Sequence, residues 1–152
     1  MKILFFIEEF GFGGKERRLM ELIHYLKQNT DFELGMVLTE NRVEFEMIHE
    51  LKVPIKIIRR RGLKRDPRVF IKFLKFCQDF KPDIIHTWGF MTTFYAIPAK
   101  FRLKIPLVSS MITVARQEFP NASLNNLFFR ISCKFSDSII SNSNAGLKAF
   151  NV

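Results

Sequence analysis

The sequence predicts an α/β fold in which a doubly wound, Rossmann-like parallel sheet of about six strands carries helices on both faces. Short apolar runs alternate along the chain with longer segments whose apolar residues recur every three or four positions, the pattern of strand followed by amphipathic helix. Most of the short runs are apolar throughout, as expected for strands covered on both faces. Right-handed crossover connections between such strands then produce a doubly wound sheet.

The first half of the chain is expected to contain three strands. A glycine-rich turn separates the first strand from a helix whose apolar residues share one face. A second helical pattern joins the second strand to the third, which begins just after Pro54. The expected strands are residues 2–7, 32–38 and 55–58, and the expected helices are residues 15–28 and 43–51.

The second half continues the same alternation. Asp66 and Pro67 are typical of a helix start, with Asp as the cap and Pro at the first position. Pro98 is expected to kink or shorten its helix, because proline has no backbone N–H to donate. Residues 110–120 are expected to be irregular. The expected strands are residues 84–87, 105–109 and 138–141, and the expected helices are residues 67–80, 91–102, 124–135 and 142–150.

Composition describes one domain with a substantial core. The chain has 152 residues, of which 47% are hydrophobic and 18 are phenylalanine, so disorder is not expected. The formal net charge of +9 is compatible with nucleic acid, an anionic membrane or a phosphorylated ligand, and it does not choose among them.

The two cysteines, Cys77 and Cys133, lie in apolar helical patterns and are expected to be buried, reduced thiols. No zinc-binding spacing is present, and neither a metal nor a cofactor is predicted. No targeting segment or membrane span is expected either. The predicted location is therefore the cytoplasm, with peripheral contact at the inner face of the membrane as an open alternative.

A functional site is expected in the loops that follow the strands, because ligands bind at the carboxyl edge of a parallel sheet. The first of these loops contains Gly13 and Gly14, followed by Lys15. Glu16 stands where a dinucleotide fingerprint would have its third glycine, and no Ser or Thr follows Lys15 as a P-loop requires. Two interpretations stay open: a tight turn, or backbone amides at a helix start that approach an anion or a sugar.

A second group of candidates lies at the ends of the fourth and fifth strands. His86 ends a central strand, where an imidazole can bond a sugar hydroxyl or a phosphate, although a core histidine is an equally common reading. Trp88 either stacks on a sugar ring or covers the end of the sheet. Gly89 and Ser110 complete this group as expected binding residues, and His86 is the one candidate for a catalytic role.

A third group is a block of basic residues after the third strand. It is predicted to contact an anionic acceptor or anionic lipid headgroups, with a solvated surface as the alternative. Nucleic acid is not expected, because no nucleic-acid-binding module is recognisable. The residues are Arg59, Arg60, Arg61, Lys64 and Arg65. No nucleophilic triad is visible, and Glu8 and Glu9 cannot act as a pair because neighbours on a strand point to opposite faces.

Several segments together resemble the amino-terminal domain of family 4 glycosyltransferases of the GT-B fold. These segments are MKILFFI at the start, GGKERR at 13–18, KPDIIHTWG at 81–89, KIPLVSS at 104–110 and FSDSIISNS at 135–143. They occur in the order of that family and cover nearly the whole chain. The resemblance implies one half of a GT-B fold.

The resemblance also implies a function. Such enzymes transfer a sugar from a nucleotide-sugar donor, with retention, to an acceptor held mainly by the amino-terminal domain. Gly13 and Gly14 would approach the donor diphosphate, and His86 matches the first histidine of a His-x-His pair whose second position is Trp88 here.

The donor-binding, carboxyl-terminal domain of that family is not recognisable in these residues, so the chain alone is expected to be inactive until a further domain or partner subunit completes it. The expected partners are a nucleotide sugar and a glycan or lipid-linked acceptor. The alternatives are a non-catalytic module that binds glycan or anionic lipid, and a nucleotide-cofactor domain, which Glu16 argues against.

Overall fold

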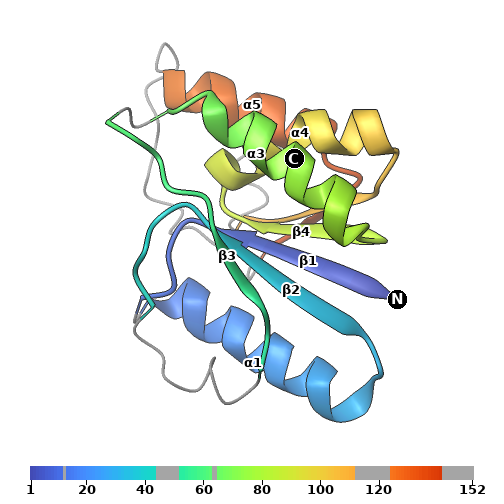
Figure 1. Ribbon diagram of the computed structural model, residues 1–152. Helices are drawn as coiled ribbons and strands as arrows, with labels where there is room; N and C mark the ends of the chain where they lie inside the picture. The colour runs from blue at the N-terminus through green and yellow to red at the C-terminus, as the bar shows by residue number, and fades with distance from the viewer. Residues whose placement is uncertain (12, 44–51, 63–64, 112–123, 142–152) are drawn as a thin grey trace.

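The computed structural model shows one six-stranded, entirely parallel sheet with the strand order β3-β2-β1-β4-β5-β6 (Figure 1). The structure describes residues 1–11, 13–43, 52–62, 65–111 and 124–141. The strands are β1 (Lys2–Ile7), β2 (Glu33–Leu38), β3 (Ile55–Ile57), β4 (Ile84–Trp88), β5 (Leu107–Ser110) and β6 (Ser138–Ile140). Each of the six predicted strands is present, and the predicted parallel pairing is confirmed.

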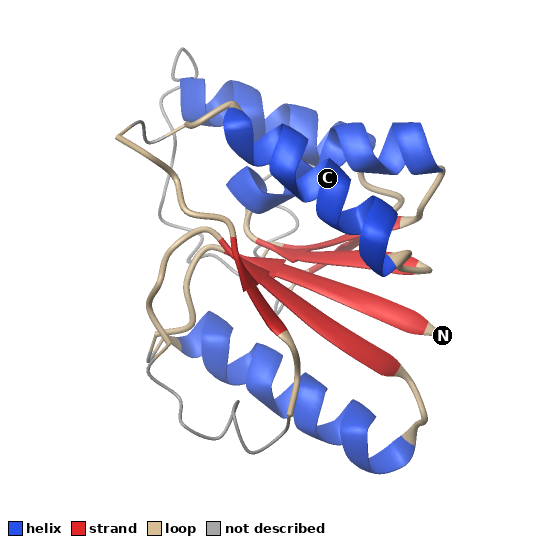
Figure 2. Ribbon diagram, viewed as in Figure 1, coloured by secondary structure: helices blue, strands red, loops and turns tan. Residues whose placement is uncertain are grey.

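Helices cover both faces of the sheet (Figure 2). Helix α1 (Gly14–Asn29) lies on one face, below the sheet in the view of Figure 1. The other three described helices lie together on the opposite face: α3 (Arg68–Phe80), α4 (Phe90–Leu103) and α5 (Leu124–Phe135). The doubly wound, Rossmann-like class predicted from the sequence is therefore confirmed. The predicted helices 43–51 and 142–150 lie outside the described residues.

Alternating side chains of β1 supply two separate hydrophobic cores. Leu4 and Phe6 point toward α3 and α4, where the Phe6 and Phe73 rings stack with centroids 4.3 Å apart. Phe5 and Ile7 point the other way and pack with Leu19 and Ile23 of α1 and with Trp88. We refer to these as the α3–α5 side and the α1 side of the sheet. Because β1 is buried on both sides, its sequence is apolar throughout.

The order of the strands reverses beside β1, which pairs with β2 on one side and with β4 on the other. Ile7, the last residue of β1, is level with Leu38 at the end of β2 and with Trp88 at the end of β4. The loops that leave these strands therefore start side by side. Ligands of open α/β sheets bind at such a reversal point, outside the carboxyl ends of the strands.

Helix α4 contradicts part of the expectation for Pro98. The helix continues through Pro98 to Leu103 and is not shortened. Proline removes a single hydrogen-bond donor, and the flanking Ala96 and Ala99 are fully buried against the sheet, so packing holds the helix together. The helix ends where Lys104 adopts a left-handed conformation and donates its N–H to the Lys100 carbonyl.

Helix α3 begins at Arg68 with Pro67 at the cap position, one residue later than predicted, so that the residue before the cap is Asp66. Its side chain is 1% exposed; Oδ1 accepts the backbone N–H of Arg68 at 3.0 Å, and Oδ2 accepts that of Arg61 at 2.9 Å. The Arg68 guanidinium, and then the Arg61 backbone N–H, hold the pKa of Asp66 far below its ordinary value.

Both cysteines are free thiols; Cys77 is buried, as expected, whereas Cys133 is only partly so. Burial raises the thiol pKa to about 12 at Cys77 and about 11 at Cys133, which makes both unreactive near neutral pH. Among the described helices, none has the length and apolar character needed to cross a membrane.

Candidate functional site

The predicted site residues gather at the carboxyl edge of the sheet, but on its two different sides. The Gly13–Gly14 turn, His86 and Trp88 belong to the α1 side, where Trp88 joins the core around Phe5 and Ile7. The basic block belongs to the α3–α5 side, where it borders a cavity. Within the described residues, no three His, Cys, Asp or Glu side chains are grouped closely enough to hold a metal ion.

The glycine turn is shaped around the carboxylate of Glu16. Gly13 caps the amino end of α1, and Glu16, at the third helical position, is buried with its carboxylate folded back onto Gly13. A Cβ on Gly13 would collide with that carboxylate, whereas a Cβ on Gly14 would meet nothing within 4 Å. The Lys15 ammonium lies 3.5 Å from the same carboxylate. The negative charge of Glu16 interacts favourably with the positive, amino-terminal end of the α1 dipole. The space that could admit a ligand lies beside Gly14.

His86 and Ser110, predicted separately, are brought together by the pairing of β4 with β5. His86 Nε2 lies 2.8 Å from Ser110 Oγ, and both residues are buried. The His86 ring also contacts Phe5 and Trp88, with centroids 5.6 Å and 5.3 Å apart. Burial lowers the pKa of His86 to about 4, so the imidazole is neutral at pH 7. It is suited to hydrogen bonding rather than to carrying charge.

Trp88 is buried in the α1-side core, with only 4% of the residue exposed. Its Nε1–H has no hydrogen-bond acceptor among the described residues. The next residue, Gly89, has φ 126° and ψ 151°, a combination open essentially only to glycine. The Gly89 carbonyl accepts hydrogen bonds from the Thr92 and Thr93 hydroxyls at 2.9 Å and 2.8 Å. Gly89 thus allows the sharp change of direction from β4 into α4.

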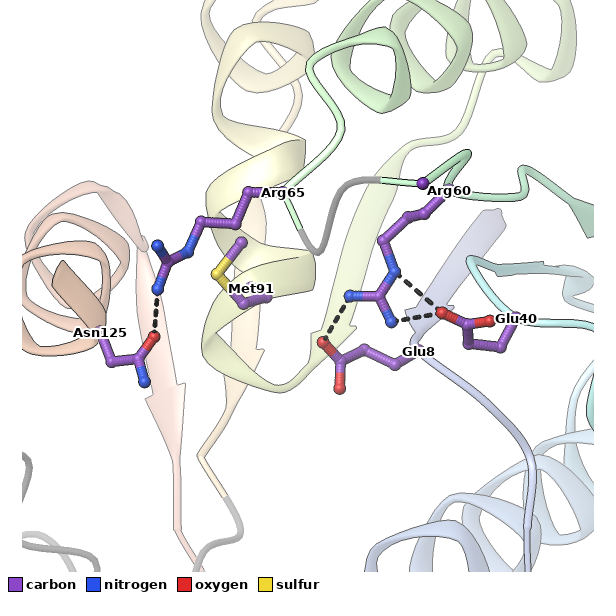
Figure 3. Close-up of a pocket in the computed structure, with 7 residues that line it drawn as sticks. Glu8, Glu40, Arg60, Arg65, Met91 and Asn125 are labelled. Atoms are coloured by element: carbon purple, nitrogen blue, oxygen red, sulfur yellow. Dashed lines mark hydrogen bonds and ion pairs between the residues drawn. The ribbon is translucent and has the colours of Figure 1, made fainter.

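On the α3–α5 side, a cavity of about 530 Å³ opens beyond the ends of the first three strands (Figure 3). Arg60, from the loop after β3, occupies one wall, and Arg65 occupies another, with Met91 between them (Figure 3). The lining residues are Glu8, Glu40, Arg60, Gly62, Arg65, Met91 and Asn125. We call this the strand-end cavity.

Arg60 joins two carboxylates that come from different strands. Its Nε and Nη2 donate to Glu40 Oε1 at 3.0 Å and 2.6 Å, and its Nη1 lies 3.7 Å from Glu8 Oε1 (Figure 3). The backbone holds the two acids close together, because the Glu8 carbonyl accepts the N–H groups of Thr39 and Glu40 at 3.0 Å and 2.9 Å. The charge of Arg60 is therefore largely balanced within the protein.

The other residues of the basic block differ in their contacts and in their exposure to solvent. Arg65 donates to Asn125 Oδ1 at 2.6 Å, and its guanidinium lies 4.8 Å from the centre of the Phe128 ring. Arg59 and Arg61 are exposed, and Arg61 is tied through its backbone to Asp66. Lys64 lies outside the described residues. The block thus places two side chains on the strand-end cavity and leaves others at the surface.

Five of the seven described residues that line the strand-end cavity were not among the predicted site residues: Glu8, Glu40, Gly62, Met91 and Asn125. Glu8 and Glu40 carried a signal, since each follows the end of one of two paired strands. Glu9 pairs instead with Arg42 at 3.5 Å, as expected for a neighbour of Glu8 that points the other way. Met91 and Asn125 are ordinary residues near helix starts, and nothing in their local sequence marks them.

Comparison with known proteins identified one family and a set of solved structures with this fold. The sequence model of Glycosyltransferase Family 4 matches residues 12–150. A search of curated protein sequences found no significant match.

Three of the similar structures illustrate the kinds of protein that share this fold. HepE from Anabaena in complex with UDP-glucose has a TM-score of 0.75 and 20% identity, with 99% of this chain and 40% of that chain covered. The lipopolysaccharide outer core galactosyltransferase WaaB has a TM-score of 0.71 and 17% identity, covering 99% and 42%. UDP-GlcNAc 2-epimerase from Neisseria meningitidis bound to UDP-GlcNAc has a TM-score of 0.70 and 14% identity, also covering 99% and 42%.

At these identities the structures share a fold with this chain, and the fold includes both transferases and epimerases. The chain spans about two fifths of the length of these solved proteins. The match to this part of such proteins, together with the family match, confirms the predicted resemblance to one half of a GT-B fold.

Proposed function

The chain belongs to glycosyltransferase family 4, and we propose that it forms the acceptor side of an enzyme that transfers a sugar from a nucleotide sugar to a glycan or lipid-linked acceptor. The observation that carries this proposal is the family match, which covers residues 12–150. The matched segment includes the Gly13–Gly14 turn, His86 and Ser110, all on the α1 side of the carboxyl edge. Structures of similar fold that hold UDP-glucose or UDP-GlcNAc support a nucleotide sugar as the donor.

We further propose that a donor-binding domain or partner subunit completes the enzyme. The similar structures are more than twice as long as this chain, which accounts for one half of their fold. The nucleotide would then be held mainly by the other half, facing the carboxyl edge of this sheet. The chain alone would bind acceptor without transferring sugar. Assembly of a polysaccharide or glycolipid in the cytoplasm is the corresponding role, and the free thiols of Cys77 and Cys133 support that compartment.

In this mechanism the chain stabilises the leaving diphosphate and positions the acceptor. Backbone amides beside Gly14, at the positive end of α1, would face the diphosphate as negative charge develops, and Lys15 would add a cation. His86 would act by hydrogen bonding, because a pKa of about 4 leaves it neutral and a weak base at pH 7. Holding the acceptor close to the anomeric carbon would supply much of the remaining rate enhancement.

Gly14 offers a direct test, because a side chain there has room in the protein itself. In the complete enzyme, Gly14→Leu should reduce transfer of radiolabelled sugar by about 100-fold or more, by blocking the approach of the diphosphate to the amides. Arg17→Leu, an exposed position on the same helix, is the matched control and should leave transfer within about twofold. Equal melting temperatures would show that both variants are folded. Full transfer by Gly14→Leu would overturn this role for the turn.

A second candidate function, peripheral contact with anionic lipid, is favoured by one feature of α5. Leu124 and Leu127 are more than half exposed, and each is next in sequence to a residue that Arg65 contacts: Asn125 and Phe128. Apolar side chains beside a cation suit the headgroup region of a bilayer. The chain should then sediment with vesicles containing phosphatidylglycerol more than with neutral phosphatidylcholine vesicles, and Leu127→Asp should reduce the difference. Equal sedimentation with both vesicles would remove this function.

A further inference from the structure

We propose that the strand-end cavity is a subsite for an uncharged, polyhydroxylated sugar unit, and that Arg60, held between Glu8 and Glu40, makes it select against anionic groups. The inference rests on the proposed function, because it names the kind of acceptor that the domain would hold. At the strand-end cavity it replaces the earlier expectation of an anionic acceptor at the basic block with a neutral one.

The first argument is charge. The chain as a whole carries a net charge of +9, yet the cavity lining contains two carboxylates, Glu8 and Glu40, and two guanidinium groups, Arg60 and Arg65. The formal charges of the described lining residues therefore cancel. A site for a phosphate or a uronate would be expected to keep an excess of positive charge.

The second argument is the geometry of Arg60. Three of its nitrogens face carboxylate oxygens, at 2.6 Å and 3.0 Å from Glu40 and 3.7 Å from Glu8. An anion that approached this guanidinium would also approach both carboxylates, and their repulsion would offset the attraction.

The third argument is the mixture of hydrogen-bonding groups. Ionised carboxylates only accept, guanidinium groups only donate, and the Asn125 side chain does both. A sugar hydroxyl both donates and accepts, so it can bond to all three kinds of group. Met91 adds an apolar surface on which the C–H face of a sugar ring can rest (Figure 3). The volume of about 530 Å³ falls within the range of small-molecule sites.

The fourth argument is that the carboxylates and Arg60 are held in place before any ligand arrives. The Glu8 carbonyl bonds the backbone of Thr39 and Glu40, and the Arg60 N–H donates to the Thr39 carbonyl at 3.4 Å. The ends of three adjacent strands are thus tied together beside the cavity. Preorganised groups of this kind lose little freedom when a ligand binds.

Met91 provides a reporter for the test, since it is the one methionine among the described residues that line this cavity. With ¹³C-methyl methionine in the full chain, and the Met91 resonance assigned by Met91→Leu, the protein is titrated with neutral disaccharides of gluco, galacto and manno configuration. Parallel titrations use digalacturonate and inorganic phosphate. At least one neutral disaccharide should shift the Met91 resonance at a concentration about tenfold lower than either anion requires.

Charge variants test the role of Arg60. The double variant Glu8→Gln with Glu40→Gln removes both negative charges beside Arg60 and should lower the phosphate concentration needed to shift Met91 by about tenfold. Glu9→Gln removes the same charge from the adjacent residue, which faces Arg42, and should leave the phosphate response unchanged. The resonances of Met20 and Met36, in the α1-side core, report whether each variant is folded.

Two results would overturn the proposal. One is a Met91 response to phosphate or digalacturonate at least as sensitive as the response to every neutral disaccharide. The other is the lack of any Met91 response to the neutral sugars. Failure of the proposed transferase function is a different result: the complete enzyme would transfer no sugar while Met91 still responded to a neutral disaccharide.

Discussion

At the scale of single residues, His86 makes stability depend on pH. The folded protein keeps this imidazole neutral, with a pKa of about 4 against an ordinary value of 6.5, because burial penalises the charged form. Below pH 6.5 the unfolded chain takes up a proton that the folded chain does not. The contribution of His86 is therefore fully present above pH 6.5 and is lost as the pH falls toward 4.

The size of this effect can be measured with His86→Gln. The two pKa values correspond to about 3 kcal/mol of unfolding free energy lost between pH 6.5 and pH 4. Urea unfolding from pH 7.5 to pH 4.5 should show a steep fall for the parent and a shallower one for His86→Gln. Ser110→Ala, which removes the hydroxyl partner but keeps the imidazole, should retain the steep fall. An equal loss of unfolding free energy with falling pH in the parent and in His86→Gln would contradict this account.

Gly13 and Glu16 should be energetically coupled. Gly13→Ala should cost about 1–3 kcal/mol, because the new Cβ collides with the Glu16 carboxylate. In a Glu16→Ala background the same change should be neutral or slightly stabilising, since φ at Gly13 is −79°, which alanine also adopts. A double-mutant cycle by urea unfolding measures the coupling, with Gly14→Ala as the uncrowded control. Additive effects would show that the carboxylate moves away without cost.

Sequence reasoning located individual strand-end residues but not their partners. His86 and Ser110 were each expected in the site from their positions, and the pairing of β4 with β5 joins them. Arg60 was expected to contact an anionic acceptor or anionic lipid, and its neighbours Glu8 and Glu40 were not foreseen. That arrangement depends on the relative alignment of three strands, which no single segment of sequence contains.

At the scale of elements, the start of α4 depends on Gly89. Gly89→Ala should destabilise the protein by about 1–3 kcal/mol, because φ of 126° and ψ of 151° are strained for any residue with a Cβ. The cause is conformational rather than steric, since the nearest atom to a Cβ there would be Thr92 Oγ1 at 3.8 Å. Thermal unfolding measures the loss, with Gly14→Ala as a glycine without positive φ. Equal stability of Gly89→Ala and the parent would show that the turn rearranges freely.

Elements were predictable where short apolar runs end in polar turns. All six strands lie within about two residues of their expected bounds, because a buried strand must be apolar and its flanking loops must be polar. Helix α4 was misjudged at Pro98, because the local penalty of one missing hydrogen bond is smaller than the packing that holds the helix on the sheet. That packing is a tertiary property and is not visible in the local pattern.

At the scale of the whole molecule, the two cores share one sheet and should unfold in a single cooperative transition. Phe73→Ala on the α3–α5 side should cost about 3–5 kcal/mol, and Ile23→Ala on the α1 side about 2–5 kcal/mol. In both variants, unfolding followed by far-ultraviolet and near-ultraviolet circular dichroism should coincide. Ile71→Ala, an exposed change on the same helix as Phe73, should stay within about 0.5 kcal/mol. Separate transitions would indicate that the two sides unfold independently.

The fold class followed from the alternation of strand and helix patterns, and the structure adds which helices share a side. Local patterns do not specify the strand order, because the apolar pattern of a strand does not identify the neighbour with which it pairs. The order places the glycine turn and the basic block on opposite sides of the sheet. The strand-end cavity is therefore a product of topology rather than of any contiguous motif.

The link that Arg60 makes between Glu8 and Glu40 has an evolutionary consequence. Loss of the arginine alone would leave two like charges side by side, and loss of both acids would leave a cation facing a cavity suited to neutral groups. The residues at these three positions should therefore covary among related sequences. Lineages that use charged acceptors should have lost both acids while keeping a cation at position 60. The residues at positions 8, 40 and 60 would then indicate where in the family the charge of the acceptor changed.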